Sequence, residues 1–285
     1  MVRLILLFWI AFIPLSIGQV DQSTNSRTIA MLHFAPVLAT QIVDLDTNTN
    51  NIIEAMALAK AAGADWVLTP ELALTGYKFR YEIGTDWIKP GIDRWTQKLQ
   101  KAANDLDLLL LLSHLQQDPV TDRRHNQIFV IDRDGEIIGQ HRKINTLPGS
   151  EAWSVAGGEP TPITLDGISV GLLICADAWP TDHARSLAEQ GAEILLSSAN
   201  WASGLYGPGN SWEKRVAETR LPLLVSNRTG IENDLDMRLA KSVVVVPTEA
   251  GAQRIFEFQS EENTIILIEF NISDNRVLAS KTINF

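Results

Sequence analysis

The amino-acid sequence predicts a layered α/β domain in which helices pack outside sheets. Apolar, strand-like runs alternate with amphipathic, helix-like stretches along most of the chain, and this alternation is typical of mixed sheets covered by helices. A length of 285 residues permits one large domain with a substantial core. No linker, repeat or low-complexity segment divides the sequence, so we expect a single domain.

The first part of the chain supplies strands and helices in alternation. Apolar runs at residues 28–34 and 65–69 predict strands, and the amphipathic stretch 48–62 between them predicts a helix. Residues 95–106 predict a second helix. The run 108–113 is apolar throughout, which is typical of a strand buried on both faces.

A hairpin and a second series of strands follow. Residues 127–133 and 136–140 flank Asp134-Gly135, and an Asp-Gly pair between two such runs is a strong hairpin signal. The Gly- and Pro-rich residues 204–210 predict a loop. The remaining predicted strands are residues 168–174, 194–198, 223–226, 242–246 and 264–268, with helices near 182–190 and 211–220.

Charge and composition exclude some classes of function. The formal net charge is −10, and no basic cluster offsets it. This balance argues against nonspecific nucleic-acid binding and against docking on an anionic membrane. We therefore expect a small-molecule partner and no nucleic-acid partner.

The N-terminus has the layout of a secretory signal peptide. Arg3 precedes a mainly apolar run from Leu4 to Ile17, and cleavage is expected after Gly18. The run is shorter than the about 20 residues of a membrane span, although an uncleaved anchor is the alternative. The sequence thus predicts a signal peptide at 1–18, a mature domain at 19–285, and export to the periplasm or the medium. Its single cysteine can form no internal disulfide.

That single cysteine, Cys175, lies where an apolar strand ends, in the sequence GISVGLLICADAWP. A thiolate is a strong nucleophile, but a free thiol has a pKa of about 8.5 and needs a nearby base or cation. A lone cysteine after an apolar strand is more often a small buried hydrophobe. Other residues must therefore decide between a catalytic and a structural cysteine.

Three charged residues also occupy notable positions. Glu71 follows an apolar strand in PELALTGY, Lys143 follows the hairpin in HRKI, and Glu151 lies eight residues beyond Lys143. An ammonium and carboxylates beside a thiol are the groups needed to attack a carbonyl or nitrile carbon. Taken singly, each has an ordinary alternative: Glu71 a helix cap, Lys143 a surface charge, and Glu151 a solvated loop residue.

The ordered set of motifs resembles the nitrilase, or carbon–nitrogen hydrolase, superfamily. PELALTGY is similar to the family's glutamate motif, HRKI to its lysine motif and ICADAWP to its cysteine motif, and Glu151 matches the spacing of its second glutamate. Agreement across most of the mature chain extends to Gly157-Gly158, Arg185, Gly191-Ala192, Arg215, Glu218, Asn227 and Gly230.

The resemblance implies a four-layer αββα sandwich, usually assembled into homodimers or larger homo-oligomers. It implies Cys175 as nucleophile, Glu71 as general base and acid, and Lys143 as the cation that stabilises the tetrahedral intermediate. Glu151 would position the substrate or support proton transfer, and the backbone N–H of Ala176 would join Lys143 at the oxyanion. No metal or organic cofactor is required.

The resemblance also indicates pocket residues and departures from the pattern. Asn200, Trp201 and Tyr206 follow the next strand, where loops commonly line the family's pocket. Ala176 replaces the aromatic or acidic residue common after the cysteine, and Pro180-Thr181 replaces a common Pro-Glu pair. The CADAW form is closer to the amidase and glutaminase branches than to true nitrilases. We expect Asp177 and Arg185 to form a structural ion pair behind the nucleophile.

These observations predict an exported amidase that hydrolyses a small linear amide through a cysteine thioester. An acyltransferase that passes the same acyl group to an amine is one alternative, and a nitrilase is another. A non-catalytic binding protein with this fold is the third alternative. It predicts the loss of at least one of the four residues Glu71, Lys143, Glu151 and Cys175, all of which are present. The membrane is a partner only if the N-terminal segment stays uncleaved.

Overall fold

The computed structural model describes residues 26–205 and 207–285. The signal peptide predicted at 1–18 lies outside these residues, as does Tyr206. Among the helices of the described part of the chain, none combines the length and apolarity needed to cross a membrane.

Two sheets form the centre of the molecule, and both are mixed. The larger has seven strands in the order β15-β14-β1-β2-β3-β4-β5, and the smaller has six in the order β13-β12-β9-β8-β7-β6. Strands β1, β2 and β3 run parallel, as do β7, β8 and β9. The larger sheet comprises β1 (Ser26–His33), β2 (Trp66–Leu68), β3 (Leu109–Gln117), β4 (Arg124–Ile131), β5 (Ile137–Arg142), β14 (Thr264–Asn271) and β15 (Arg276–Asn284).

The smaller sheet is built from the second half of the chain. It comprises β6 (Ile163–Leu165), β7 (Ile168–Ile174), β8 (Ile194–Ala199), β9 (Leu223–Asn227), β12 (Ser242–Thr248) and β13 (Gly251–Phe258). A separate two-stranded ribbon pairs β10 (Ile231–Glu232) with β11 (Leu235–Asp236).

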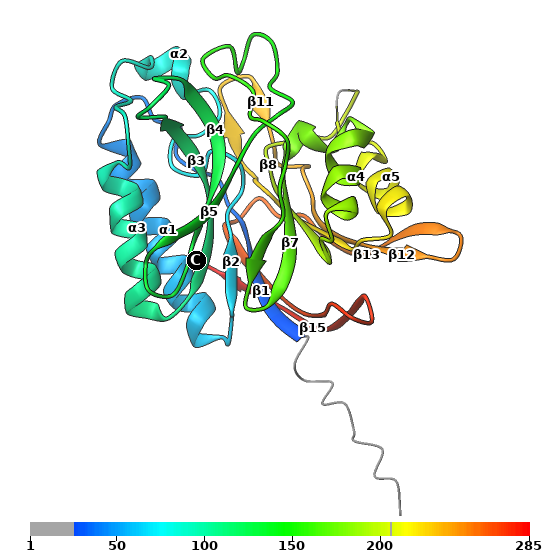
Figure 1. Ribbon diagram of the computed structural model, residues 1–285. Coiled ribbons are helices and arrows are strands. Elements are labelled where there is room, and N and C mark those ends of the chain that lie inside the picture. Colours follow the sequence, from blue (N-terminus) through cyan, green and yellow to red (C-terminus); the bar gives the residue numbers. More distant parts are fainter. Residues whose placement is uncertain (1–25, 206) are drawn as a thin grey trace, which may run out of the picture.

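Helices cover the outer face of each sheet, which confirms the four-layer αββα sandwich (Figure 1). Helices α1 (Asp44–Ala61) and α3 (Arg94–Leu106) lie against the larger sheet, whereas α4 (Thr181–Glu189) and α5 (Ser211–Thr219) lie against the smaller one. The short helix α2 (Phe79–Ile83) follows the glutamate motif, and the 3₁₀ turn η2 (Cys175–Ala178) follows β7 directly.

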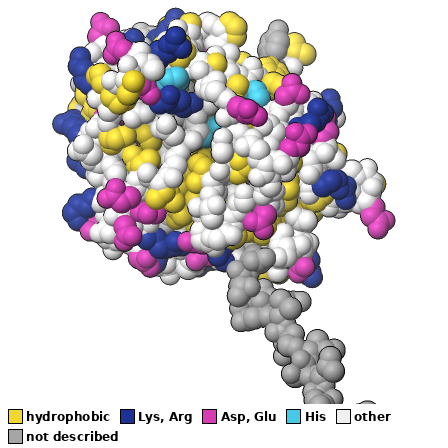
Figure 2. Space-filling view, viewed as in Figure 1, with side chains coloured by type: hydrophobic (Ala, Val, Ile, Leu, Met, Phe, Trp, Pro, Cys, Tyr) yellow, Lys and Arg dark blue, Asp and Glu magenta, His cyan; other side chains and the backbone are white. Residues whose placement is uncertain are grey.

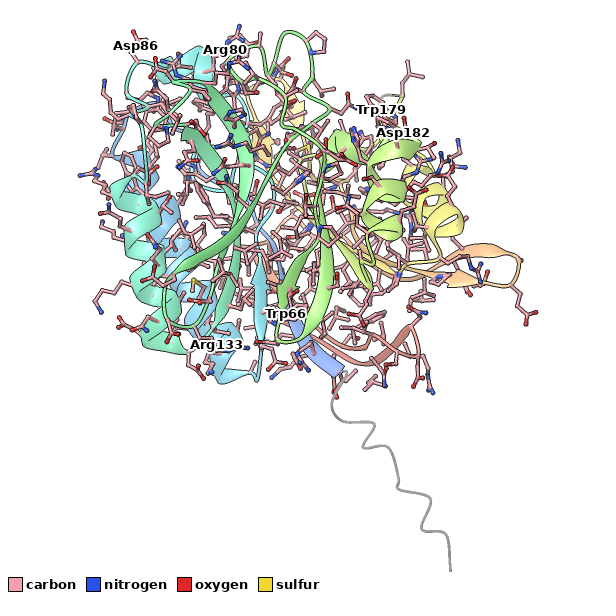
Figure 3. All side chains as sticks on the ribbon, in the orientation of Figure 1. Trp66, Arg80, Asp86, Arg133, Trp179 and Asp182 are labelled. Atoms are coloured by element: carbon pink, nitrogen blue, oxygen red, sulfur yellow. The ribbon has the colours of Figure 1, made fainter. Side chains whose placement is uncertain are left out.

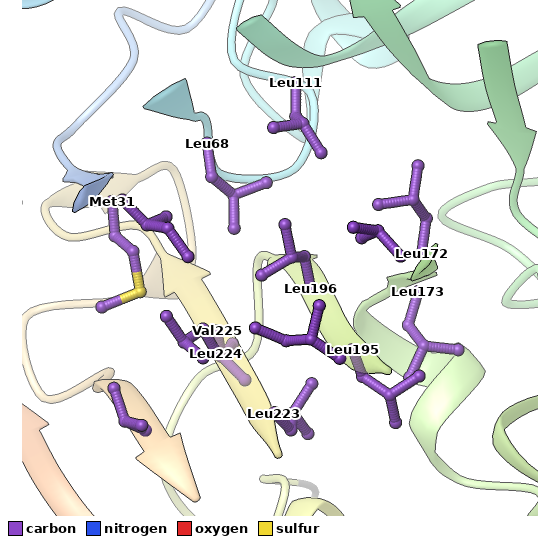
Figure 4. Packing of buried hydrophobic residues seen from close by; sticks show 14 of the residues in the cluster. Met31, Leu68, Leu111, Leu172, Leu173, Leu195, Leu196, Leu223, Leu224 and Val225 are labelled. Carbon is purple, nitrogen blue, oxygen red and sulfur yellow. The ribbon is translucent and has the colours of Figure 1, made fainter. Parts of the chain in front are cut away.

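Apolar side chains fill the space between the sheets. Met31, Leu68 and Leu111 of the larger sheet belong to the same buried cluster as Leu172 and Leu196 of the smaller sheet (Figure 4). Burial of this area supplies the main favourable term in folding at about 25 cal/mol per Å². The core therefore holds the two sheets, and with them their strand ends, in a fixed relation.

A charged contact joins the sheets at the end where β2 begins. The indole Nε1 of Trp66 donates to Asp166 Oδ2 at 2.8 Å, and Arg133 Nη1 donates to Asp166 Oδ1 at 2.5 Å. Trp66 and Arg133 lie close together at this end, far from Trp179 and Asp182 (Figure 3). On the face seen in Figure 2, basic and acidic side chains are interspersed.

The predicted elements are present, and the largest difference concerns β3. The strand expected at 108–113 runs on to Gln117, because β4 pairs with it from Leu110 to Gln117, which lies opposite Arg124. The polar residues His114 and Gln116 are buried in this extension, so pairing with a neighbour outweighed their polarity. The hairpin at Asp134-Gly135 is confirmed between β4 and β5. The sequence analysis did not predict α2, β6, β10, β11, β13 or β15.

Candidate active site

Three of the predicted residues lie just beyond the carboxyl ends of strands. Glu71 comes shortly after β2, Lys143 directly after β5, and Cys175 directly after β7. Strands β2 and β5 run in the same direction in the larger sheet, so their carboxyl ends lie at one edge of it, where α/β proteins place their sites, whereas β7 belongs to the smaller sheet. Glu151 lies in the loop between β5 and β6.

Lys143 is the centre of the site. Its side chain is fully buried, and Nζ donates to Glu71 Oε1 at 2.6 Å and to Glu151 Oε1 at 2.5 Å. Both carboxylates are also fully buried. A buried ammonium is tolerated only when paired, and here one cation serves two anions. The structure thus brings together three residues that lie 8 and 72 positions apart in the sequence.

Asn126 of β4 completes this cluster, and the sequence analysis missed it. Its Nδ2 donates to Glu71 Oε1 at 2.8 Å and to Glu151 Oε1 at 3.1 Å. Its backbone carbonyl oxygen accepts from Lys143 N at 2.8 Å. One feature of the sequence could have indicated it: Asn126 is an amide directly before the strand predicted at 127–133. A polar side chain buried beside such a strand needs a hydrogen-bond partner. Asn126 therefore holds both acids through its side chain and the lysine segment through its backbone.

Tyr77, which the sequence analysis quoted in the glutamate motif without a role, also faces the site. It is buried, and its hydroxyl forms a 3.1 Å hydrogen bond with Ser150 Oγ. Burial raises the pKa of Tyr77 well above its usual value, with smaller effects from Lys143 and the acidic groups. The phenol is therefore neutral, and it links the glutamate loop to the loop that carries Glu151.

Cys175 begins the turn η2 in an unusual backbone conformation. Its φ is 48°, in the left-handed region, which costs a non-glycine residue about 1–2 kcal/mol. The thiol is buried, and Sγ lies 3.7 Å from the carbonyl oxygen of Asn200. Ala199, the last residue of β8, accepts a hydrogen bond at its backbone carbonyl from the N–H of Glu71 at 3.3 Å. The end of β8 therefore contacts both the thiol and the glutamate loop.

The charges of the site set the protonation states. Burial, together with the charge of Glu151, raises the pKa of Glu71 to about 7 against the opposing effect of Lys143. Burial and the charge of Glu71 raise the pKa of the Cys175 thiol well above its usual value. Burial opposes the charge on Lys143, but the neighbouring acidic groups raise its pKa well above normal. At rest the thiol is protonated and the lysine charged.

One oxygen of Glu71 is left available. Oε1 accepts from both Lys143 and Asn126, whereas Oε2 is buried without a hydrogen-bond partner among the described residues. By contrast, Glu151 uses its second oxygen to accept from Leu147 N at 2.6 Å. A buried, unpaired carboxylate oxygen is costly, and accepting a proton would relieve that cost. Glu71 therefore has the free oxygen that a proton acceptor needs, whereas both oxygens of Glu151 are held by hydrogen bonds.

The predicted pocket residues lie in different surroundings. Ala176 is buried, and its carbonyl accepts from Asn145 Nδ2 at 2.7 Å. Asn200 is buried, and neither atom of its amide has a partner within the described ranges. Trp201 is buried between Trp179 and Trp212, in edge-to-face contacts at 5.4 and 5.7 Å. Tyr206 lies outside the described residues.

The expected ion pair between Asp177 and Arg185 is wrong. Arg185 is about half exposed, with Nη1 3.8 Å from Asp182 Oδ1, and Asp182 lies near Trp179 at the start of α4 (Figure 3). Asp177 is fully buried and accepts from His141 Nε2 at 2.9 Å. The sequence analysis paired opposite charges that are close along the chain, whereas the fold brings a histidine from the other sheet.

Comparison with known proteins identifies the family. The sequence model described as carbon-nitrogen hydrolase matches residues 28–269. The chain therefore belongs to the carbon–nitrogen hydrolase family and is an enzyme of this class.

Relatives and a solved structure agree with this assignment. A glutamine-dependent NAD(+) synthetase from Rhodobacter capsulatus is 30% identical over 67% of this chain, which spans only 35% of the synthetase. A nitrilase from Pyrococcus abyssi is 28% identical over 83% of this chain and 89% of the nitrilase. A mutant of the amidase from Nesterenkonia sp. AN1 has a TM-score of 0.73 at 25% identity, over 87% of this chain and 92% of the amidase. That structure shows the acetamide moiety of fluoroacetamide covalently added at the active-site cysteine.

Proposed function

We propose that this carbon–nitrogen hydrolase cleaves a small amide through a thioester on Cys175. The observation that carries the proposal is the buried ammonium of Lys143 shared by Glu71 and Glu151 beside the thiol. The covalent cysteine adduct of the Nesterenkonia amidase supports the same nucleophile. Glu71 acts as general base and acid, and Glu151 holds Lys143 and positions the substrate.

In the first half-reaction, the amide is converted into a thioester. Glu71 Oε2 takes the thiol proton as Sγ attacks the carbonyl carbon, and the C=O electron pair moves onto oxygen. The ammonium of Lys143 and the backbone N–H of Ala176 stabilise that oxyanion. Glu71 then donates its proton to the departing nitrogen, so the C–N bond breaks and ammonia or an amine leaves. A pKa of about 7 for Glu71 suits both transfers at neutral pH.

In the second half-reaction, water releases the acyl group. Glu71 takes a proton from water, and the resulting hydroxide attacks the thioester carbon. The new tetrahedral intermediate collapses, the C–S bond breaks, and the thiol recovers its proton from Glu71. Lys143 stays charged throughout, because its partners hold its pKa well above normal. Asn200, Trp201 and Tyr206 are proposed to line the acyl pocket. The side-chain amide of Asn200, which has no partner among residues 26–205 and 207–285, supports this for Asn200 itself.

The test is a screen of small amides, with nitriles and carbamoyl compounds in parallel. Wild-type protein incubated briefly with a substrate should gain the mass of one acyl group on Cys175 and release ammonia. Cys175→Ala should show neither, while remaining folded. Turnover by Cys175→Ala at the wild-type rate would rule out the thiol mechanism. Adding a primary amine separates the alternatives, since an acyltransferase would form a new amide in place of the acid.

We also propose export and self-assembly, as the sequence predicts. Arg3 and the apolar run behind it support cleavage after Gly18. N-terminal sequencing of secreted protein should begin near Gln19, and a chain that begins at Met1 would favour the anchor. Light scattering after gel filtration should give the mass of two or more chains, and a monomer would overturn the homo-oligomer.

A further inference from the structure

The carboxylate of Asp177 accepts four hydrogen bonds, more than a simple ion pair would involve. Its side chain is fully buried. Oδ1 accepts from the backbone N–H groups of Ile144 at 3.0 Å and Asn145 at 2.7 Å. Oδ2 accepts from the backbone N–H of Ile174 at 3.0 Å and from His141 Nε2 at 2.9 Å. An ionised carboxylate has about four acceptor sites, so Asp177 is saturated.

The partners of Asp177 flank the two reacting groups. Ile144 directly follows Lys143, and Ile174 directly precedes Cys175. His141 belongs to the end of β5 in the larger sheet, whereas Ile174 ends β7 in the smaller sheet. One carboxylate therefore bonds both chain segments that carry the ammonium and the thiol, although these segments come from different sheets.

A second bond runs parallel to these contacts, from Asn145 Nδ2 to the carbonyl of Ala176 at 2.7 Å. The turn that begins at Cys175 needs such support, because φ at Cys175 is 48° and a left-handed non-glycine residue persists only where its surroundings impose it. Asp177 binds the N–H just before this residue. The carboxylate therefore supports the strained turn as well as joining it to the lysine segment.

We propose that Asp177, oriented by His141, is a positioning residue that sets the placement of the Cys175 thiol relative to Lys143. Its hydrogen bonds in the described part of the chain go to backbone N–H groups and to His141, not to the thiol or the ammonium, so it acts through the backbone on each side. This inference rests on the proposed function. It goes beyond it by assigning the placement of the nucleophile to a buried aspartate and to the histidine two residues before the catalytic lysine.

The charges around Asp177 fit a fixed, ionised carboxylate. Burial alone would raise its pKa, but hydrogen bonds from His141 and Asn145 and the charge of Lys143 hold the pKa below its usual value. His183 Nδ1 lies 3.9 Å from Oδ1 and adds a second imidazole on the side of α4. An asparagine at position 177 would place its side-chain NH₂ group against other hydrogen-bond donors. Depending on which way the amide turns, either the backbone N–H of Ile174 or those of Ile144 and Asn145 would lose their acceptor.

The experiment compares Asp177→Asn with a matched control, Asp166→Asn. Asp166 also joins the two sheets, through Trp66 and Arg133, but at the opposite end. Alkylation of Cys175 by iodoacetamide, followed by intact mass, measures the reactivity of the thiol without a known substrate. Asp177→Asn should lower the labelling rate and kcat by about 100-fold with little change in KM, since small misplacements of reacting groups cost that much. Asp166→Asn should leave both rates at wild-type values.

A second pair of variants tests the role of His141 and covers a failure of Asp177→Asn to fold. His141→Gln keeps an N–H donor, whereas His141→Leu removes it. His141→Gln should keep most of the labelling rate that His141→Leu loses. A purely structural role of His141 would not require this difference. Equal labelling rates in these two variants, or wild-type rates in folded Asp177→Asn, overturn the inference. The proposed function fails separately, if wild type forms no thioester with any amide.

Discussion

Two groups of buried ions lie at the ends of strands, and they differ in charge balance. In one, Lys143 is shared by Glu71 and Glu151, and all three side chains are fully buried. In the other, Arg228, which directly follows β9, has Glu232 as its single acidic partner among the described residues, and both are again buried. The second oxygen of Glu232 accepts from the backbone N–H of Lys78 at 2.5 Å.

The difference lies in how the buried charges are balanced, and it fits a reactive role proposed for the first group and a structural role for the second. The cluster around Lys143 has one more acid than base, so burial and a neighbouring anion raise the pKa of Glu71, and Glu71 Oε2 is left without a partner among the described residues. In the Arg228 pair one anion meets one cation and both oxygens of Glu232 are bonded. Excess charge and an unpaired oxygen distinguish the Lys143 cluster, as expected if this is the site that performs the proposed chemistry.

The largest expected effect comes from neutralising the excess acid. Glu71→Gln should lower kcat by about 10³-fold, because the general base and acid is lost. It should not lower the free energy of unfolding at pH 8, since it removes a buried charge that burial disfavours. Ammonia release and urea unfolding measure the two quantities. A variant that keeps a tenth of the wild-type kcat would remove Glu71 from its proposed role.

The opposite pattern is expected at the balanced pair. Arg228→Met should lower the free energy of unfolding by about 3–5 kcal/mol, because it leaves Glu232 buried without a counter-charge. The kcat of folded protein should stay near the wild-type value. In the double variant Arg228→Met/Glu232→Gln, part of the stability should return, since no charge is buried alone. Loss of kcat comparable to that of Glu71→Gln would show that both groups serve the reaction.

The positions of these groups differ in how far the sequence could predict them. Glu71 and Cys175 follow apolar strands and Lys143 follows the hairpin, but their shared site was predicted from the resemblance of their motifs to a known family. Strand ends alone could not join Cys175 to the others, because β7 lies in the other sheet. The pairing of β3 with β4 was not predictable, because polar residues in the extension of β3 are buried only by their neighbour strand. Asn126 was missed for the same reason, since its partners come from loops after other strands.

Asp177 shows a second limit on prediction from sequence. An aspartate followed eight positions later by an arginine suggests a local ion pair, whereas the fold places His141 of the other sheet against Asp177 and leaves Arg185 at the surface. Contacts between the two sheets depend on how they pack face to face, and that packing is set by the whole core. Hydropathy patterns predict which strands exist, but they say little about which strand ends of one sheet contact those of the other.

The charge imbalance also predicts the dependence on pH. Thiol attack requires ionised Glu71, so kcat/KM should rise as the pH passes about 7. Stability should change in the opposite direction: because the pKa of Glu71 is raised from 4.5 to about 7, its contribution to stability is complete below pH 4.5 and is lost as the pH rises through 7. Urea unfolding of wild type and Glu71→Gln across this range isolates the contribution. A flat kcat/KM between pH 6 and pH 8 would contradict the assignment.

Asn126 offers the finest test of the same imbalance, because it adds hydrogen bonds without adding charge. Its Nδ2 donates to Glu71 and Glu151, and a hydrogen bond to the charged form lowers the pKa of a carboxyl. Asn126→Ala should therefore move the midpoint of the kcat/KM profile to higher pH and lower kcat/KM at pH 6 by roughly tenfold, as a lost bond to a charged group of ~1.5 kcal/mol implies. The control is Gln127→Ala on the same strand, since Gln127 donates to Gln116 instead and should leave the midpoint unchanged. Equal midpoints in all three proteins would mean that the hydrogen bond from Asn126 does not set the pKa of Glu71.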